Sequence, residues 1–277
     1  VVELIGRAIT ALPEDVVKAL DSAATNESSQ IAQRELRLIR ENAKEAKACT
    51  LPMCQDTGVP IFFVKMGFPV AGFEDIVARG VRRATGEVPL RSNVVDPLTR
   101  KNTGDNTGHL MPYISYSYAK CDHIELTYLP KGAGSENMSA LAMLTPSQGI
   151  EGIKKFVLQT VVNAEGKPCP PVVVGVGIGG ASDICMSLAK KSLLRPVGSH
   201  NSDPAVAAIE DDLLNMINAT GIGPMGLGGD TTALAVHIEC ADCHTASLPV
   251  GVNLQCYAAR RAVVRIYSDG RAEFGGI

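Results

Sequence analysis

The stretch PCPPVVVGVGIGGASD, residues 168–183, decides the fold class, because it predicts a buried strand that runs through a glycine-rich turn into a helix. Prolines precede the apolar run and glycines follow it. From Asp183 onward, the residues DICMSLAKKSLLR have the composition of a helix. We therefore expect a strand, a turn and a helix at the start of the second half of the chain.

Helices are also predicted on both sides of this unit. The first 48 residues read as helices, one beginning at Pro13. Another has small or apolar residues at alternating spacings of four and three, namely Ala32, Leu36, Ile39, Ala43 and Ala46. Further on, Asp203 and Pro204 form the cap and first residue of a helix that Gly221 stops.

Strands alternate with these helices, so the predicted class is α/β, or mixed α+β. VPIFFVKMG (59–67) predicts a buried strand, while YISYSYAK (113–120) and HIELTYLP (123–130) predict a hairpin. Three further strands are expected in residues 231–240, 248–256 and 262–268, and residues 90–110 form a long polar connection. We expect a helical N-terminal cap followed by two mixed-sheet lobes, divided near residues 164–170.

Composition favours a small-molecule partner. The 277 residues are 45% hydrophobic and carry a net charge of -3, which argues against a basic surface for nucleic acid or an anionic membrane. No apolar run approaches the ~20 residues of a membrane span, and the first residues lack the features of an export signal. These observations predict a cytoplasmic protein.

The segment GVGIGG matches the glycine pattern of dinucleotide sites with Gly175, Gly177 and Gly180. A second strand ending in an acidic residue should follow about 20 residues later, but residues 193–204 are a polar loop. We therefore favour a tight turn with close packing of helix on strand. A nucleotide-dependent oxidoreductase stays open as an alternative.

The segment CADCH, from Cys240 to His244, fits the pattern for covalent haem attachment or half of a zinc site. The absence of an export signal opposes the haem, and no second pair of ligands with zinc spacing accompanies it. We favour two partly buried thiols at a strand end.

Eight cysteines in a chain of this length need not form disulfides, because a reducing cytosol keeps thiols free. Cys54, Cys169 and Cys256 each lie at the edge of an expected strand. Three thiolates from separate segments would suit an iron–sulfur cluster, although each taken alone is more often a buried apolar residue.

Five separated motifs carry a family resemblance: LPMCQDTG (51–58), LRSNVVDPLTRKNTGDNT (90–107), KGAGSENMS (131–139), NAEGKPCPPVVVGVGIGG (163–180) and HTASLPVGVNLQCYAARR (244–261). Together they resemble the separate alpha subunit of the iron–sulfur-dependent class I fumarase family. The L-tartrate dehydratase alpha subunit belongs to the same family, but RKNTGDNT and GSENMS are more similar to the fumarase branch.

The resemblance implies a [4Fe-4S] cluster held by Cys54, Cys169 and Cys256. Three protein ligands leave one iron free to act as a Lewis acid toward the substrate's hydroxyl group. The cluster would then be a catalyst of hydration, with no net redox change.

The resemblance also assigns roles to five other residues. Gln55, Arg91 and Gly134 match substrate-binding positions of the family, and the fork of an arginine suits a carboxylate. Asp56 matches the residue that supports proton transfer next to the substrate carboxylate, and His244 matches a proton-relay or hydrogen-bonding group.

The implied activity is the reversible hydration of fumarate to L-malate by residues 1–277, taken as one hydro-lyase alpha domain. Tartrate dehydration and a non-catalytic cluster-binding protein are the alternatives. Because the sequence stops before the family's second domain, we expect an incomplete enzyme that needs a beta subunit. The expected partners are that subunit, in a hetero-oligomer, and a dicarboxylate, with neither nucleic acid nor membrane.

Overall fold

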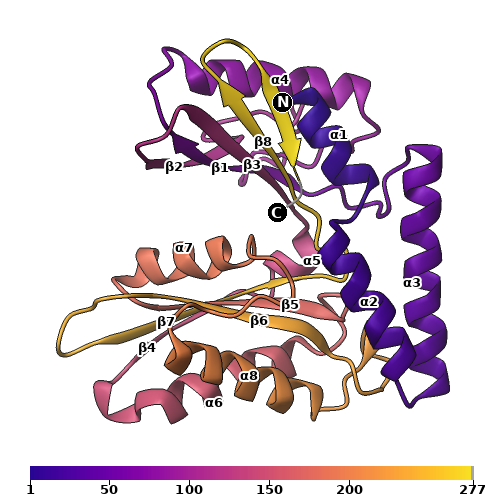
Figure 1. Ribbon diagram of the computed structural model, residues 1–277, viewed down its shortest axis with the longest axis vertical. Coiled ribbons are helices and arrows are strands. Elements are labelled where there is room, and N and C mark those ends of the chain that lie inside the picture. The colour runs from indigo at the N-terminus through magenta and orange to yellow at the C-terminus, as the bar shows by residue number, and fades with distance from the viewer. Residues whose placement is uncertain (276–277) are drawn as a thin grey trace. The chain divides into compact units, whose positions relative to one another are not determined.

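The computed structural model describes residues 1–275 and has a mixed α/β fold with helices at its N-terminus and two mixed sheets (Figure 1). The chain forms two compact units. Unit 1 comprises Val1–Glu14, Asn42–Gly132 and the chain from Arg260 onward, and unit 2 comprises Asp15–Glu41 and Ala133–Ala259. The position expected to divide the lobes, near 164–170, lies inside unit 2, where the flanking helix and strand share one hydrophobic core.

Three helices open the chain, as predicted: α1 (Val2–Thr10), α2 (Glu14–Asn26) and α3 (Gln30–Cys49). The five positions that predicted one face of α3 are all buried. The buried face of α3 that the spacing of small and apolar residues predicts is therefore confirmed.

The sheet of unit 1 has the strand order β2-β1-β3-β8-β9. Its strands are β1 (Val59–Met66), β2 (Tyr113–Tyr118), β3 (His123–Lys131), β8 (Ala262–Tyr267) and β9 (Ala272–Gly275). The predicted hairpin of β2 with β3 is wrong, because β1 lies between them, parallel to β2 and antiparallel to β3. The largely buried, apolar β1 takes the inner position, and strand composition alone does not specify the neighbour.

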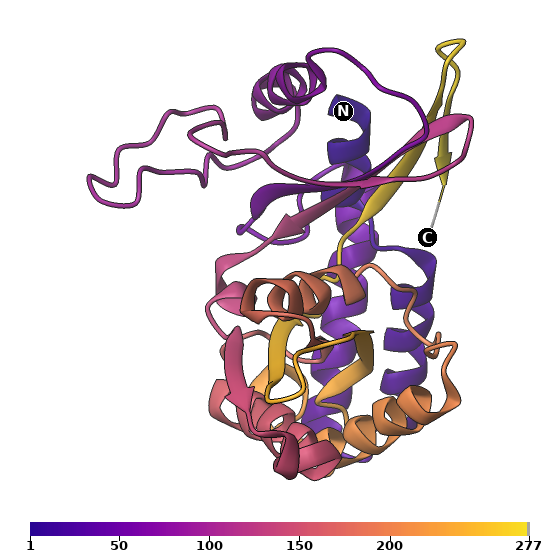
Figure 2. The ribbon, with the colours of Figure 1, turned by 90° about the vertical axis from the view of Figure 1, so that its left-hand side faces the viewer.

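Helices α1 and α4 (Phe73–Glu87) supply the core of unit 1. Their buried side chains, among them Leu4, Ile5, Val77 and Val81, pack with Phe62, Val64, Leu126 and Val264 of the sheet. Between α4 and β2 runs a long connection with only isolated bridges (Figure 2). This connection carries the polar motif of residues 90–110.

The sheet of unit 2 has the order β4-β7-β5-β6. Its strands are β4 (Ala140–Leu144), β5 (Val172–Gly179), β6 (Ala233–Ala241) and β7 (Leu248–Gln255). Strand β5 is parallel to β6 and antiparallel to β7. The predicted strand of residues 168–183 is thus an inner strand of this sheet.

Helices cover both faces of the unit 2 sheet (Figure 1). Helices α6 (Gly149–Ala164) and α8 (Pro204–Asn218) pack on one face through Val157, Val161, Leu213 and Ile217, whereas α7 (Ser182–Ser192) covers the other. The short elements are α5 (Ala133–Glu136), η1 (Pro146–Gln148) and η2 (Pro224–Gly226). The predicted start of α8 is confirmed, since the Asp203 carboxylate accepts a hydrogen bond from the Ala205 N–H at 2.8 Å.

The glycines of GVGIGG allow α7 to approach β5 closely, as predicted. A Cβ atom on Gly175 would lie 2.1 Å from the carbonyl oxygen of Ala189, and one on Gly177 would lie 1.9 Å from that of Cys185. No larger residue fits at these positions without moving the helix. Helix packing therefore accounts for this motif.

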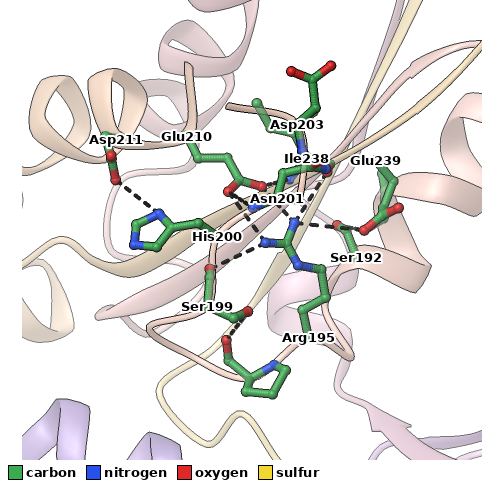
Figure 3. A network of polar contacts seen from close by, with 12 residues as sticks. Ser192, Arg195, Ser199, His200, Asn201, Asp203, Glu210, Asp211, Ile238 and Glu239 are labelled. Atoms are coloured by element: carbon green, nitrogen blue, oxygen red, sulfur yellow. Dashed lines mark hydrogen bonds and ion pairs between the residues drawn. The ribbon is translucent and has the colours of Figure 1, made fainter. Parts of the chain in front are cut away.

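Buried Glu210 of α8 forms an ion pair with Arg195 of the preceding loop and also accepts a hydrogen bond from β6 (Figure 3). The carboxylate of Glu210, which is 2% exposed, accepts hydrogen bonds from Arg195 Nη1 at 2.7 Å and from the Ile238 N–H at 2.7 Å. It also accepts from the Asn201 N–H at 2.9 Å. Multiple donors of this kind are what make a buried carboxylate tolerable.

Candidate active site

In unit 1, the CQDTG motif forms the turn between α3 and β1. The Asp56 carboxylate accepts a hydrogen bond from the Gly58 N–H at 2.9 Å, which closes an Asx turn. The turn is anchored at its start by the Asn42 side chain, which donates to the Met53 carbonyl at 2.7 Å. Cys54 and Asp56 are half-buried on this turn, and Gln55 is exposed.

The turn requires glycine at position 58. Gly58 has a φ of +77°, and a Cβ atom there would meet the backbone nitrogen of Lys131 at 2.7 Å. Across from it, a Cβ on Gly132 would lie 3.1 Å from Oδ2 of Asp56. The end of β3 therefore lies directly against the Asp56 turn.

The polar connection of unit 1 is fastened to the same turn. Thr57 Oγ1 accepts a hydrogen bond from the Arg91 N–H at 3.0 Å. The Asn93 side-chain amide donates to the Gly58 carbonyl at 3.1 Å and to Oδ1 of Asp56 at 3.4 Å. Backbone contacts thus fix Arg91 beside Asp56, while its own side chain is exposed and available to a ligand.

A second layer of contacts holds this connection. Buried Asn106 accepts a hydrogen bond from the Asn93 N–H at 2.8 Å and donates to the Arg91 carbonyl at 3.0 Å. Beside it, Asp105 accepts from the Arg82 guanidinium at 3.0 Å. Burial raises the pKa of the Asp105 carboxyl, but hydrogen bonds from Thr107 and Arg82 outweigh it and hold the pKa well below its ordinary value.

In unit 2, the structure brings Cys169 and Cys256 together. Cys169 lies in the turn between α6 and β5, and its carbonyl oxygen accepts a hydrogen bond from the Tyr257 N–H at 3.0 Å. Cys256 directly follows β7, whose Gln255 is paired with Val173 of β5. Both cysteines are half-buried. Cys54 belongs to unit 1.

The loop with Gly134 is tied to the Cys169 turn and to the sheet. A Cβ atom on Gly134 would lie 3.3 Å from the carbonyl oxygen of Lys167. Two residues on, Glu136 forms an ion pair with Lys190 of α7 and accepts a hydrogen bond from the Asn253 side chain at 2.9 Å. This polar network holds the exposed backbone of Gly134 beside the Cys169 turn.

His244 occupies an exposed turn between β6 and β7, where its Nδ1 accepts a hydrogen bond from the Ala246 N–H at 3.0 Å. It precedes β7, whereas Cys256 follows β7. An eight-residue strand spans roughly 25 Å. Within unit 2, therefore, the structure does not bring His244 beside Cys169 or Cys256.

None of the eight cysteines, all within the described residues, forms a disulfide. Cys185 is buried in α7, and burial raises the pKa of its thiol, which disfavours the thiolate that a metal requires. Cys240 and Cys243 are exposed, so the prediction that they are partly buried is wrong; both lie where β6 ends and the chain turns back. Anywhere in residues 1–275, these two included, no three or more His, Cys, Asp or Glu side chains are grouped so that they could hold a metal ion.

Three residues of unit 1 that the sequence did not predict as part of the site contribute contacts at the Asp56 turn: Thr57, Asn93 and Arg260. Arg260 Nη2 donates a hydrogen bond to the backbone carbonyl oxygen of Asp56 at 2.9 Å. Thr57 lies in the motif LPMCQDTG and Asn93 in LRSN, so membership of these motifs could have marked both as site residues. Nothing in the sequence distinguished Arg260 from its neighbour Arg261.

Comparison with known proteins gives a consistent result. Residues 1–265 match the sequence model of the fumarate hydratase (fumerase) family. A protein of Methanocaldococcus jannaschii, which its name assigns provisionally as L(+)-tartrate dehydratase subunit alpha, is 54% identical over 98% of both chains. The L(+)-tartrate dehydratase subunit alpha of Escherichia coli strain K12 is 36% identical over 94% of this chain and 87% of its own length.

The chain therefore belongs to the fumarate hydratase family of hydro-lyases. Within that family it groups with the alpha subunits of class I fumarases and tartrate dehydratases, as the sequence motifs predicted. Across residues 1–275, no helix combines the length and apolar character needed to cross a membrane.

Proposed function

We propose that this chain is the cluster-binding alpha subunit of a hydro-lyase that reversibly hydrates fumarate to L-malate. The observation that carries the proposal is the arrangement around Asp56, where one turn holds a thiol and a carboxylate while the Arg91 segment is hydrogen-bonded to the next residue. A thiol ligand, an acid–base group and a carboxylate-binding cation are the parts that such a reaction needs.

The donor set suits an iron–sulfur cluster. Cys54, Cys169 and Cys256 are half-buried and form no disulfide, and the Cys169 carbonyl accepts a hydrogen bond from Tyr257, the residue after Cys256. Thiolates are the soft ligands that such clusters prefer. When bound, a [4Fe-4S] cluster with three protein ligands supplies Lewis-acid chemistry to the hydroxyl group of the substrate.

The other residues bind the dicarboxylate and move a proton. The exposed guanidinium of Arg91 binds one carboxylate in a bidentate manner, and Gln55 and the Gly134 N–H donate hydrogen bonds to the substrate. Asp56, fixed by Gly58 and Asn93, transfers the proton at the carbon next to a carboxylate. His244 is given no step in this proposal, because it precedes β7 whereas Cys256 follows it.

A beta subunit completes the proposed enzyme. Relatives of this chain are named as alpha subunits, which supports a hetero-oligomer. The partner would contribute further lysine and arginine contacts to the dianionic substrate, whose desolvation must be offset by fixed cations.

L(+)-tartrate dehydration is a second candidate, and the names of the relatives favour it. Both reactions remove a hydroxyl group from one carbon and a proton from its neighbour, so the same residues serve either. The test is to measure kcat/KM of the anaerobic complex of both subunits with fumarate, L-malate and L(+)-tartrate. Preference for fumarate and malate supports the main proposal. Preference for tartrate replaces it with the second, and turnover of none of them contradicts both.

A further inference from the structure

Arg260 is a buried cation for which residues 1–275 provide no ion pair. Its side chain is among the largest fully buried ones, with 1% of the residue exposed. Nη2 donates to the Asp56 carbonyl, but Nε and Nη1 are buried and have no hydrogen-bond partner among the described residues. The guanidinium thus uses only a small part of its donor capacity.

This arrangement is energetically unfavourable unless something else completes it. A buried charge that lacks a partner carries a large desolvation penalty. A lysine could lose its proton to relieve that penalty, but the guanidinium group of arginine stays charged. The unmet N–H groups of Arg260 therefore point to an anion that the described part of the chain does not supply.

Tyr128 does not supply that anion. Burial raises the pKa of Tyr128, and the nearby positive charge of Arg260 only opposes this rise, so its hydroxyl stays neutral at physiological pH. The other group that Arg260 contacts is a neutral backbone carbonyl, that of Asp56. The free donors accordingly lie next to the turn that carries the proposed proton-transferring carboxylate.

We propose that Arg260 is a further substrate-binding residue: one of its two free donors, Nε or Nη1, binds a carboxylate of the four-carbon dicarboxylate while Nη2 holds the Asp56 turn. The inference rests on the proposed function and extends it by one residue. A carboxylate bound at either of these nitrogens would satisfy one unpaired donor and neutralise the charge.

The test compares Arg260→Met, Arg260→Lys and the control Arg265→Met in the complex of both subunits. Arg265 lies on β8 with an exposed side chain paired to Glu125. Binding of succinate, a four-carbon dicarboxylate that cannot lose or gain water in this reaction, is measured by calorimetry, and iron content is measured in parallel.

We expect Arg260→Met to weaken succinate binding about 10- to 100-fold with unchanged iron content, because charge-assisted hydrogen bonds are lost. Arg260→Lys retains the charge and part of the affinity, and Arg265→Met binds as the wild type does. The cluster-free Arg260→Met chain should also unfold at a temperature no lower than the wild type, because an unpaired buried charge has been removed.

Three results overturn the inference. Undiminished succinate binding by Arg260→Met excludes the carboxylate contact. Loss of iron with intact succinate binding assigns the charge to the cluster instead. Earlier unfolding of Arg260→Met assigns Arg260 to the fold. A wild-type complex that binds no succinate and hydrates no substrate would contradict the proposed function itself, which keeps the two failures distinct.

Discussion

The backbone N–H of Tyr257 donates a hydrogen bond to the carbonyl oxygen of Cys169 at 3.0 Å. This bond joins the turn before β5 to the residue after Cys256, so two proposed ligands from distant parts of the sequence become neighbours in unit 2. Ligand placement therefore depends on the sheet, and changes in either turn should affect the cluster.

The backbone of Cys169 is strained, with a φ of +56°. A residue with a side chain pays about 1 kcal/mol for this left-handed conformation, whereas glycine does not. We expect Cys169→Gly to be at least as stable as Cys169→Ala in urea unfolding of the cluster-free chain, although glycine ordinarily destabilises. A Gly variant less stable than the Ala variant by 0.5 kcal/mol or more, roughly the usual glycine penalty, would show that the strain is absent.

Asn93 should matter to catalysis more than to cluster binding. Its amide donates to Asp56 and to the Gly58 carbonyl, so Asn93→Asp would place a second carboxylate beside Asp56. We expect kcat to fall about 10- to 100-fold with unchanged iron content. Ser92→Ala, next in the chain and directed to Asn102, is the matched control and should keep most of its activity. Equal losses in both variants would refute the specific role of Asn93.

Glu210 should be important for the stability of unit 2. Glu210→Gln leaves Arg195 without its buried carboxylate, and breaking such a pair lowers the free energy of unfolding by about 3–5 kcal/mol. Glu239, 3.7 Å from the same guanidinium and 34% exposed, provides the control, and Glu239→Gln should cost less than about 1 kcal/mol. Urea unfolding of both variants decides the matter, and comparable values would contradict the prediction.

The lowered pKa of Asp105 predicts that its contribution to the stability of unit 1 is lost at acidic pH. Because the pKa of Asp105 is lower in the folded chain, its stabilising effect is present above its ordinary pKa of about 4 and is lost as the pH falls through the folded value. Asp105→Asn should therefore lower the unfolding temperature at pH 7 and lower it progressively less toward pH 3. A difference between variant and wild type that is constant across this range would exclude the carboxylate as its source.

The sequence predicted local structure better than long-range pairing. Asp203, Pro204 and the spacing of apolar residues located α8, because caps and periodicity act within one element. The β2–β3 pairing failed because β1 enters between the two strands, and their composition does not encode that choice. Likewise, the division into units follows tertiary contacts, since each unit is assembled from separated segments.

For the candidate site, too, the sequence predicted local features better than long-range contacts. The motifs named the cysteines and Asp56, but the contacts that position them come from residues such as Asn93 and Arg260, which only the folded chain brings to the turn. The placement of His244 at the far end of β7 could not be predicted from its motif, because spacing in the sequence does not reveal which end of a strand faces the ligands.

The most direct test of the central proposal is an iron and sulfide count after anaerobic reconstitution of the full chain. The count is made for the wild type, for serine variants of Cys54, Cys169 and Cys256, and for the control Cys49→Ser, whose thiol is exposed on α3. We expect about four irons per chain in the wild type and the control, and loss of the cluster in the other three variants. A wild type without iron, or serine variants that keep it, would contradict the assignment of this site.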